Sequence, residues 1–126
     1  YYAALPKQSD DAESYKKQQG FLDALQVKNY FTVRKGRLER RGDTFVEKGV
    51  DVALAVDMLE MGYNNSFDTA ILVSGDGDLS KAVASIKRIG KHVENVCASH
   101  MISKHLQQTC DVFNNLDEEF LRNCWR

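Results

Sequence analysis

The chain of 126 residues is 43% hydrophobic, 28% charged and 10% aromatic, which is typical of a globular domain and excludes a disordered, collagen-like or disulfide-rich chain. Its formal net charge of −1 provides no overall positive field, so a nucleic-acid partner would need a local basic patch. Apolar runs such as Val52–Val56 are far shorter than the roughly 20 residues of a membrane helix. The three cysteines have no C-x-x-C spacing, which suits a reducing compartment. We therefore expect a cytoplasmic protein without a membrane partner.

The first third of the chain is predicted to contain a strand, a helix and a basic hairpin. Residues 1–5 form a short apolar run, and a helix is expected to begin at Ser9 or Asp10. Aromatic and β-branched residues predict a second strand at Tyr30–Val33. The next stretch, 34–43, is rich in Arg and Lys and punctuated by glycines, which favours a hairpin or an exposed loop.

Helices and strands alternate along the rest of the chain. A largely apolar helix is expected from Val50 to Met61 with Gly62 as its C-cap, and residues 68–74 predict a strand covered on both faces. The remaining predicted elements are a helix at 79–89, a strand at 92–97, a short helix at 102–108 and a strand or edge at 111–116. This alternation predicts an α/β fold, a Rossmann-like three-layer domain with a central, mostly parallel sheet.

The strand at 68–74 leads into the sequence S-G-D-G-D at 74–78, which contains two carboxylates, Asp76 and Asp78. In a parallel sheet such a loop lies at the carboxyl edge, where ligands bind. Two carboxylates a few ångströms apart repel each other unless a cation lies between them, and their hard oxygen atoms suit Mg²⁺ or Mn²⁺. The alternative is that Asp78 caps the next helix and Asp76 is a turn residue.

A third carboxylate, Asp51, is expected at the same edge, because it lies in the first turn of a helix that follows a strand. Asp57 lies about 9 Å further along that helix and is turned about 120° away, so it is predicted to be an ion-pair or hydrogen-bond partner. A dinucleotide-binding loop is a rival interpretation of residues 74–78. Two carboxylates in that loop would repel a pyrophosphate.

Three stretches with a specific spacing give the strongest signal. They are K-G-V-D-V at 48–52, L-A-V-D-M-L at 54–59 and D-T-A-I-L-V-S-G-D-G-D at 68–78. This combination resembles the NYN domain family, most closely its LabA-like branch, within the PIN-like nuclease superfamily. The resemblance is good over about residues 48–117 and looser before them.

The resemblance implies a divalent-metal-dependent ribonuclease. Asp51, Asp76 and Asp78 match the family's acidic, catalytic positions, which hold Mg²⁺ or Mn²⁺, and Ser74 matches its small hydroxyl residue before the glycine. In that mechanism the metal ion lowers the pKa of a bound water and stabilises charge on the scissile phosphate. We expect an endoribonuclease that hydrolyses phosphodiester bonds in single-stranded or structured RNA.

One departure from the family pattern concerns the sheet. Family members begin with a central strand that contains a further aspartate, whereas residues 1–5 resemble the family's second strand. We therefore expect a single NYN-type, PIN-like domain over residues 1–126, incomplete at its N-terminus and lacking its first, central strand. A longer polypeptide, a homo-oligomer or another segment would have to supply that strand, because unpaired buried ladders are very unfavourable.

Basic residues around the predicted hairpin are candidates for contacts with RNA phosphates, which would give salt-dependent affinity without sequence readout. A solvated hairpin without a ligand is the alternative. The candidate nucleic-acid-binding residues are Arg34, Lys35, Arg37, Arg40, Arg41 and Lys48.

Other chemistries are weaker. The spacing of Cys97, His100, His105 and Cys110 resembles a zinc knuckle, but no glycine loosens the segment between them, which favours free thiols. A non-catalytic NYN-type regulatory or RNA-binding module that keeps the acidic pocket is the alternative function. An HAD-like phosphatase, suggested by D-G-D, ranks last, because its nucleophilic aspartate would end the first strand.

Overall fold

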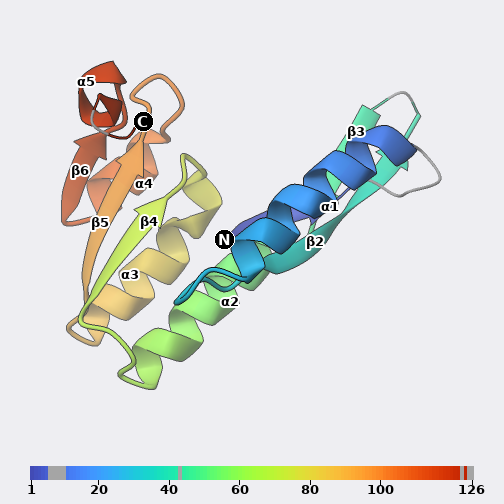
Figure 1. Cartoon of the computed structure of the whole chain (residues 1–126). Coiled ribbons are helices and arrows are strands. Elements are labelled where there is room, and N and C mark those ends of the chain that lie inside the picture. Colours follow the sequence, from blue (N-terminus) through green and yellow to red (C-terminus); the bar gives the residue numbers. More distant parts are fainter. Residues whose placement is uncertain (6–10, 43, 123, 125–126) are drawn as a thin grey trace. The chain divides into compact units, whose positions relative to one another are not determined.

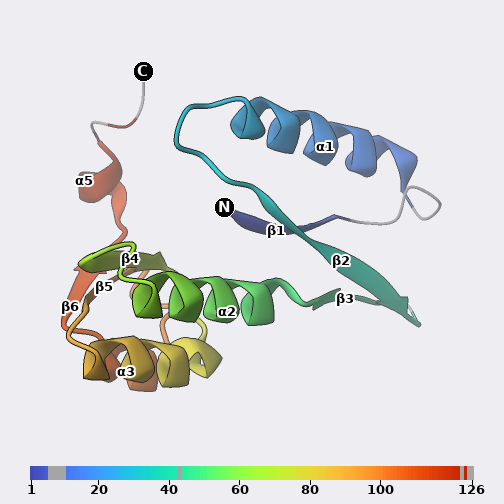
Figure 2. The same ribbon diagram turned by 90° about the horizontal axis from the view of Figure 1, so that it is seen from below.

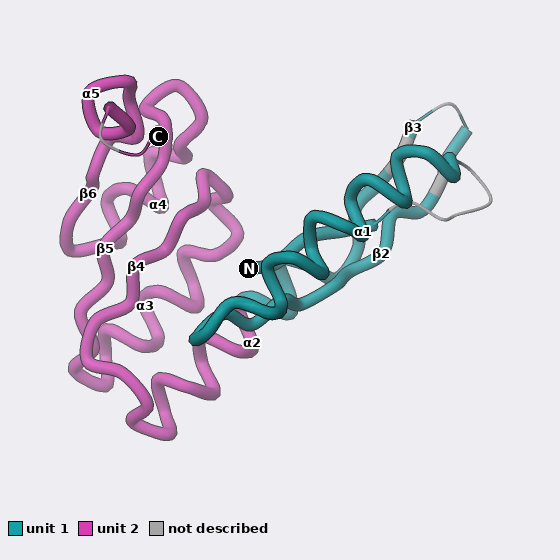
Figure 3. The backbone as a smooth tube through the Cα atoms, viewed as in Figure 1, with its two compact units in different colours: residues 1–54 teal, residues 55–126 magenta. Residues whose placement is uncertain are grey.

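The computed structural model describes residues 1–5, 11–42, 44–122 and 124 (Figure 1). These residues form two compact units, 1–54 and 55–126 (Figure 3). The expectation of a single domain over the whole chain stays a prediction.

The first unit contains a three-stranded sheet and a helix. Strand β1 (Tyr2–Leu5) pairs in parallel with β2 (Arg34–Arg41), which forms an antiparallel hairpin with β3 (Thr44–Lys48). Helix α1 (Ala12–Gln26) begins after Asp11, whose carboxylate accepts a hydrogen bond from the Ser14 backbone N–H at 2.9 Å. This bond lowers the pKa of Asp11. The expected basic hairpin is confirmed, and the start of the predicted helix, Ser9 or Asp10, lies outside the described residues.

The predicted strand at Tyr30–Val33 is wrong. Tyr30 has a φ of 63°, in the left-handed region that a strand cannot contain, and β2 begins only at Arg34. The start of this stretch belongs to the preceding turn, in which the Phe31 N–H donates to the Lys28 carbonyl at 3.2 Å. The basic stretch is therefore itself a strand.

Helix α2 (Val50–Tyr63) begins in the first unit and ends in the second, where a parallel sheet follows. The sheet consists of β4 (Thr69–Val73), β5 (His92–Cys97) and β6 (Val112–Asn115), in that order. Between these strands lie a 3₁₀ turn, η1 (Gly77–Leu79), and two helices, α3 (Ser80–Arg88) and α4 (Lys104–Thr109), and α5 (Glu118–Leu121) follows β6. Figure 2 shows α3 along one face of this sheet. The predicted α/β class with a parallel sheet is confirmed.

The core of the second unit lies between the sheet and its helices. Val83 and Ile86 of α3, Val93 of β5 and Leu106 of α4 are each 0% exposed. Burying side chains of this size contributes about 1.5–3 kcal/mol each. The buried side chains thus anchor the sheet on its helical side.

Two predicted features of this region are wrong. Gly62 does not cap α2, which continues to Tyr63. It is buried so close to α3 that a Cβ there would lie 2.9 Å from Ile86 Cγ2. β4 is not covered on both faces, since Ile71 is 65% exposed and Val73 is 66% exposed. Within the described residues β4 is an edge strand that pairs with β5 alone.

The sequence predicted one sheet that lacks its central strand. The described residues form two three-stranded sheets, β1-β2-β3 and β4-β5-β6. β1 lies at the edge of one and β4 at the edge of the other, so each has one side without a partner strand among the described residues. None of the described helices is long and apolar enough to cross a membrane.

An ion pair at the amino end of the parallel sheet gives a pH-dependent stability. Lys87 Nζ lies 2.9 Å from Asp111 Oδ1, and the Val93 N–H donates to Asp111 Oδ2 at 2.8 Å. The Lys87 hydrogen bond and then the Val93 N–H hold the pKa of Asp111 below its ordinary value. This stabilisation is therefore complete above the unfolded-state carboxyl pKa and is lost as the pH falls through the lowered one.

We expect Asp111→Asn to reduce the free energy of unfolding by about 1 kcal/mol at pH 7 and to have a smaller effect near pH 2. Urea unfolding at both pH values measures this, with the exposed Glu118→Gln as the control. An equal loss at the two pH values would contradict the role of the charged carboxylate.

Candidate acidic site at the carboxyl end of β4

The loop that follows β4 is organised by its own side chains. Ser74 Oγ accepts from the Asp76 N–H at 3.1 Å, and Asp76 Oδ1 accepts from the Asp78 N–H at 2.9 Å. Asp76 therefore caps η1, whereas the N-cap of α3, Leu79, makes no side-chain hydrogen bond. The alternative in which Asp78 caps the next helix is wrong. Asp76 is a turn residue, as that same alternative predicted.

Two glycines let a neighbouring segment lie against this loop. A Cβ on Gly75 would lie 2.4 Å from the Met101 carbonyl oxygen, and a Cβ on Gly77 would lie 2.7 Å from Ser103 Oγ. The Ser103 N–H also donates to the Gly75 carbonyl at 3.0 Å. Both glycines are needed for space and not for a positive φ, and the loop is held from outside as well as from within.

Asn95 holds the junction of β4 and the loop, and the sequence analysis missed it. Its side chain is 0% exposed, and its Nδ2 donates to the carbonyls of Leu72 and Ser74 at 3.0 and 2.9 Å. Its Oδ1 is buried without a hydrogen-bond partner among the described residues. The signal was available, because an amide in the middle of a buried strand costs free energy unless it is bonded.

The structure brings together two of the three predicted acidic residues. Asp76 is half-buried and Asp78 is exposed, and both lie on the one loop after β4. Asp51 is exposed in the first turn of α2 and belongs to the other compact unit. Among the described residues no three His, Cys, Asp or Glu side chains are gathered closely enough to hold a metal ion. The donor chemistry of the loop nevertheless fits Mg²⁺ or Mn²⁺, since its carboxylates and the Ser74 hydroxyl are hard oxygen ligands.

The basic residues do not form one patch. Side chains alternate along β2, so Lys35, Arg37 and Arg41 share one face, and Arg34 lies on the other. Two cations are already paired, Lys35 with Asp23 at 3.3 Å and Lys48 with Glu39 at 3.0 Å. The side chain of Arg40 lies outside the described part of the structure.

The hypothetical zinc site is not assembled in the described residues. Cys97 and Cys110 are buried, whereas His100 and His105 are exposed. Burial raises the pKa of the Cys110 thiol, which disfavours the thiolate that zinc requires. All three cysteines are free thiols.

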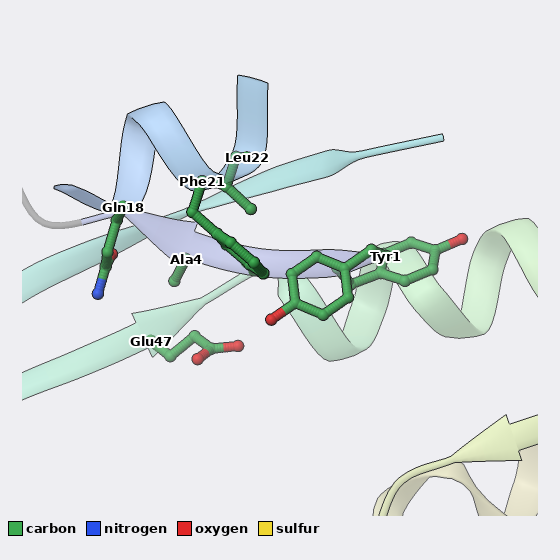
Figure 4. Close-up of a pocket in the computed structure, with 8 residues that line it drawn as sticks. Tyr1, Ala4, Gln18, Phe21, Leu22 and Glu47 are labelled. Atoms are coloured by element: carbon green, nitrogen blue, oxygen red, sulfur yellow. The ribbon is translucent and has the colours of Figure 1, made fainter. Parts of the chain in front are cut away.

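A cavity of about 400 Å³ lies beside β1 in the first unit (Figure 4). Tyr1 and Phe21 form an edge-to-face pair in its wall, with ring centroids 6.2 Å apart. Glu47 is the charged side chain in its lining. An anionic wall does not favour phosphate, so we do not place the candidate site there.

Fold and loop together define an α/β protein with a carboxylate-bearing turn at the carboxyl edge of a parallel sheet. A sequence profile described as the NYN domain matches residues 1–117. The chain belongs to the NYN domain family, which is PIN-like and generally consists of nucleases. The resemblance identified from residues 48–117 is confirmed.

Two curated proteins are similar to this chain. The chain is 29% identical over 107 residues to the low amplitude and bright protein LabA of Synechococcus elongatus, covering 80% of this chain and 56% of LabA. It is 37% identical over 71 residues to the uncharacterized protein MJ0482 of Methanocaldococcus jannaschii, covering 56% of this chain and 30% of that protein. The chain thus spans about half or less of these curated relatives.

A solved structure has the same fold. The crystal structure of VPA0982, a protein of unknown function from Vibrio parahaemolyticus, superposes with a TM-score of 0.66 at 26% identity. The match covers 92% of this chain and 67% of that one.

Proposed function

We propose that this chain is the catalytic part of a divalent-metal-dependent endoribonuclease. The observation that carries the proposal is the loop after β4, whose hydrogen bonds and close packing fix the backbone at Asp76 and Asp78 at the carboxyl edge of the sheet. Membership of a family that generally consists of nucleases supports the same function.

Asp76 and Asp78 are the proposed metal ligands in the second unit, and Asp51, which belongs to the first unit, stays a predicted ligand. Mg²⁺ or Mn²⁺, when bound, supplies an activated water and positive charge at the scissile phosphate. The chain's own contribution is to hold the carboxylates: Ser74 and the backbone N–H of Asp78 fix Asp76, and Asn95 fixes the end of β4. A loop that is already ordered loses little freedom when a ligand binds.

The strand face that contains Lys35, Arg37 and Arg41 is the proposed contact for the RNA backbone. Because Lys35 is partly neutralised by Asp23, we expect Arg37 and Arg41 to contribute more. Contacts of this kind position RNA without reading its sequence.

The test is cleavage of a labelled single-stranded RNA by the full-length polypeptide in Mn²⁺ and in EDTA, with Mn²⁺ binding measured by calorimetry on the same sample. We expect product in Mn²⁺ and intact RNA in EDTA. Intact RNA in both, from a folded protein that binds Mn²⁺, would reject the nuclease and favour the non-catalytic NYN module. Release of phosphate from a small monoester, without RNA cleavage, would favour the phosphatase.

A further inference from the structure

A recess in the second unit lies directly beside the acidic loop. Its volume is about 360 Å³, and its wall comes from η1, the start of α3 and α4. The lining residues are Gly77, Asp78, Ser80, Lys81 and His105. The recess therefore shares Asp78 with the candidate site.

Two side chains that can bind an anion line this recess. Lys81 is exposed in the first turn of α3, and His105 is exposed in α4. In the described part of the chain neither side chain is held in an ion pair, whereas Lys87 is paired with Asp111 at 2.9 Å. Lys81 and His105 are thus available to a ligand without breaking an internal contact.

The backbone at the recess runs directly from η1 into α3, which has nine residues, and Asp76 caps the start of η1. A carboxylate therefore already lies at the positive end of this helical segment, and the attraction for an anion comes from Lys81 and His105. Ser80 does not compete for that anion, because its hydroxyl donates to the Gly77 carbonyl at 2.6 Å.

The charge pattern favours a phosphate on one side of the recess. Asp78 repels an anion, whereas Lys81 and His105 attract one, so the preferred position is against the two basic side chains. A phosphate held there lies next to the carboxylate loop. In a polymer, the neighbouring phosphate would then reach Asp76 and Asp78.

We infer that this recess is a phosphate subsite, which binds the RNA backbone phosphate adjacent to the scissile one through Lys81 and His105. The inference rests on the proposed function for the choice of RNA as the ligand. It names residues outside both the carboxylate set and the basic hairpin. The subsite fixes which phosphodiester reaches the carboxylates.

The experiment measures binding without cleavage. A fluorescein-labelled single-stranded RNA is titrated with the full-length protein in EDTA, and again in Ca²⁺, at several salt concentrations. The variants are Lys81→Ala, His105→Ala and both together. The matched control is Lys104→Ala, which removes an exposed cation from the residue next to His105 but not from the recess.

We expect Lys81→Ala to raise the dissociation constant about 5- to 10-fold near 0.1 M salt, and to reduce the slope of log K against log salt by about 0.7, the value for one phosphate contact on a single strand. His105→Ala should raise it about 2- to 5-fold, as expected for the loss of one solvent-exposed hydrogen bond. Lys104→Ala should change it less than about twofold. Both recess side chains are exposed, so the variants should keep the thermal stability of the parent.

Unchanged binding by the double variant, an equal effect of Lys104→Ala, or no binding of RNA by the parent protein in either buffer would overturn the subsite. The nuclease can fail separately. Weakened binding by Lys81→Ala, with no cleavage by the parent in Mn²⁺, would keep the subsite and reject catalysis. RNA cleavage that is lost in Asp78→Asn, with both cleavage and RNA binding unchanged in Lys81→Ala, would keep catalysis and reject the subsite.

Discussion

Asp78→Asn is expected to lower the rate of Mn²⁺-dependent RNA cleavage about 100-fold or more while leaving the fold intact. The amide has nearly the shape of the carboxylate but lacks the negative charge that a hard cation requires. The backbone N–H of residue 78 still donates to Asp76 Oδ1, and the side chain is exposed, so folding loses little. Single-turnover cleavage with RNA and Mn²⁺ in excess gives the rate.

The matched control for this variant is Asp68→Asn. Asp68 is also an exposed carboxylate of the second unit, but it precedes β4, at the end of the strand opposite to the loop. It lies 3.5 Å from Lys91, so its loss should change stability by less than about 1 kcal/mol. Equal cleavage by the Asp78 variant and the parent, or an equal loss in the control, would remove Asp78 from the proposed mechanism.

Much of the second unit could be predicted from sequence because its patterns are local. The strand at 92–97 has the predicted bounds, since β-branched Val93 and Val96 follow Gly90 within this short stretch. The bounds of β6 fall within the predicted 111–116. Two features depend on distant contacts and were missed: Gly62 lies against Ile86, and β4 has one exposed face, on which Ile71 and Val73 lie.

The candidate site shows the same division. The loop S-G-D-G-D could be found from its spacing, and it lies after β4 as expected. The sequence marks Asn95 as a polar residue within a predicted strand, but its partners could not be predicted, because they are two carbonyls more than twenty residues away in the chain. The basic stretch was expected to act as a unit, but as a strand its side chains alternate between two faces. The sequence shows how many basic residues the stretch contains, but its backbone conformation determines which of their side chains lie on the same face.

Gly75→Ala is expected to reduce the free energy of unfolding by about 2 kcal/mol and to weaken Mn²⁺ binding about 10-fold. The added methyl group would lie 2.4 Å from the Met101 carbonyl oxygen and 3.1 Å from Cys97 Sγ, and a backbone oxygen cannot move aside as a flexible side chain can. Overpacking of this kind costs about 1–3 kcal/mol. If the Met101–Ser103 segment or the loop shifts instead, the Ser103 bond to Gly75 weakens and the carboxylates lose their support.

Gly20→Ala is the control, because at this exposed position of α1 a Cβ would meet nothing within 4 Å beyond its own helix backbone and chain neighbours, as far as the described residues extend. It should stabilise the protein by about 0.5–1 kcal/mol and leave Mn²⁺ binding unchanged. Urea unfolding and calorimetric titration with Mn²⁺ give both quantities. A Gly75 variant with parental stability and parental Mn²⁺ affinity would mean that the loop tolerates displacement, and the close approach of Met101 would then not be what fixes the carboxylates. Stability lost with Mn²⁺ affinity retained would instead separate the packing of the loop from its proposed chemistry, because the carboxylates would then bind the ion without the support of that segment.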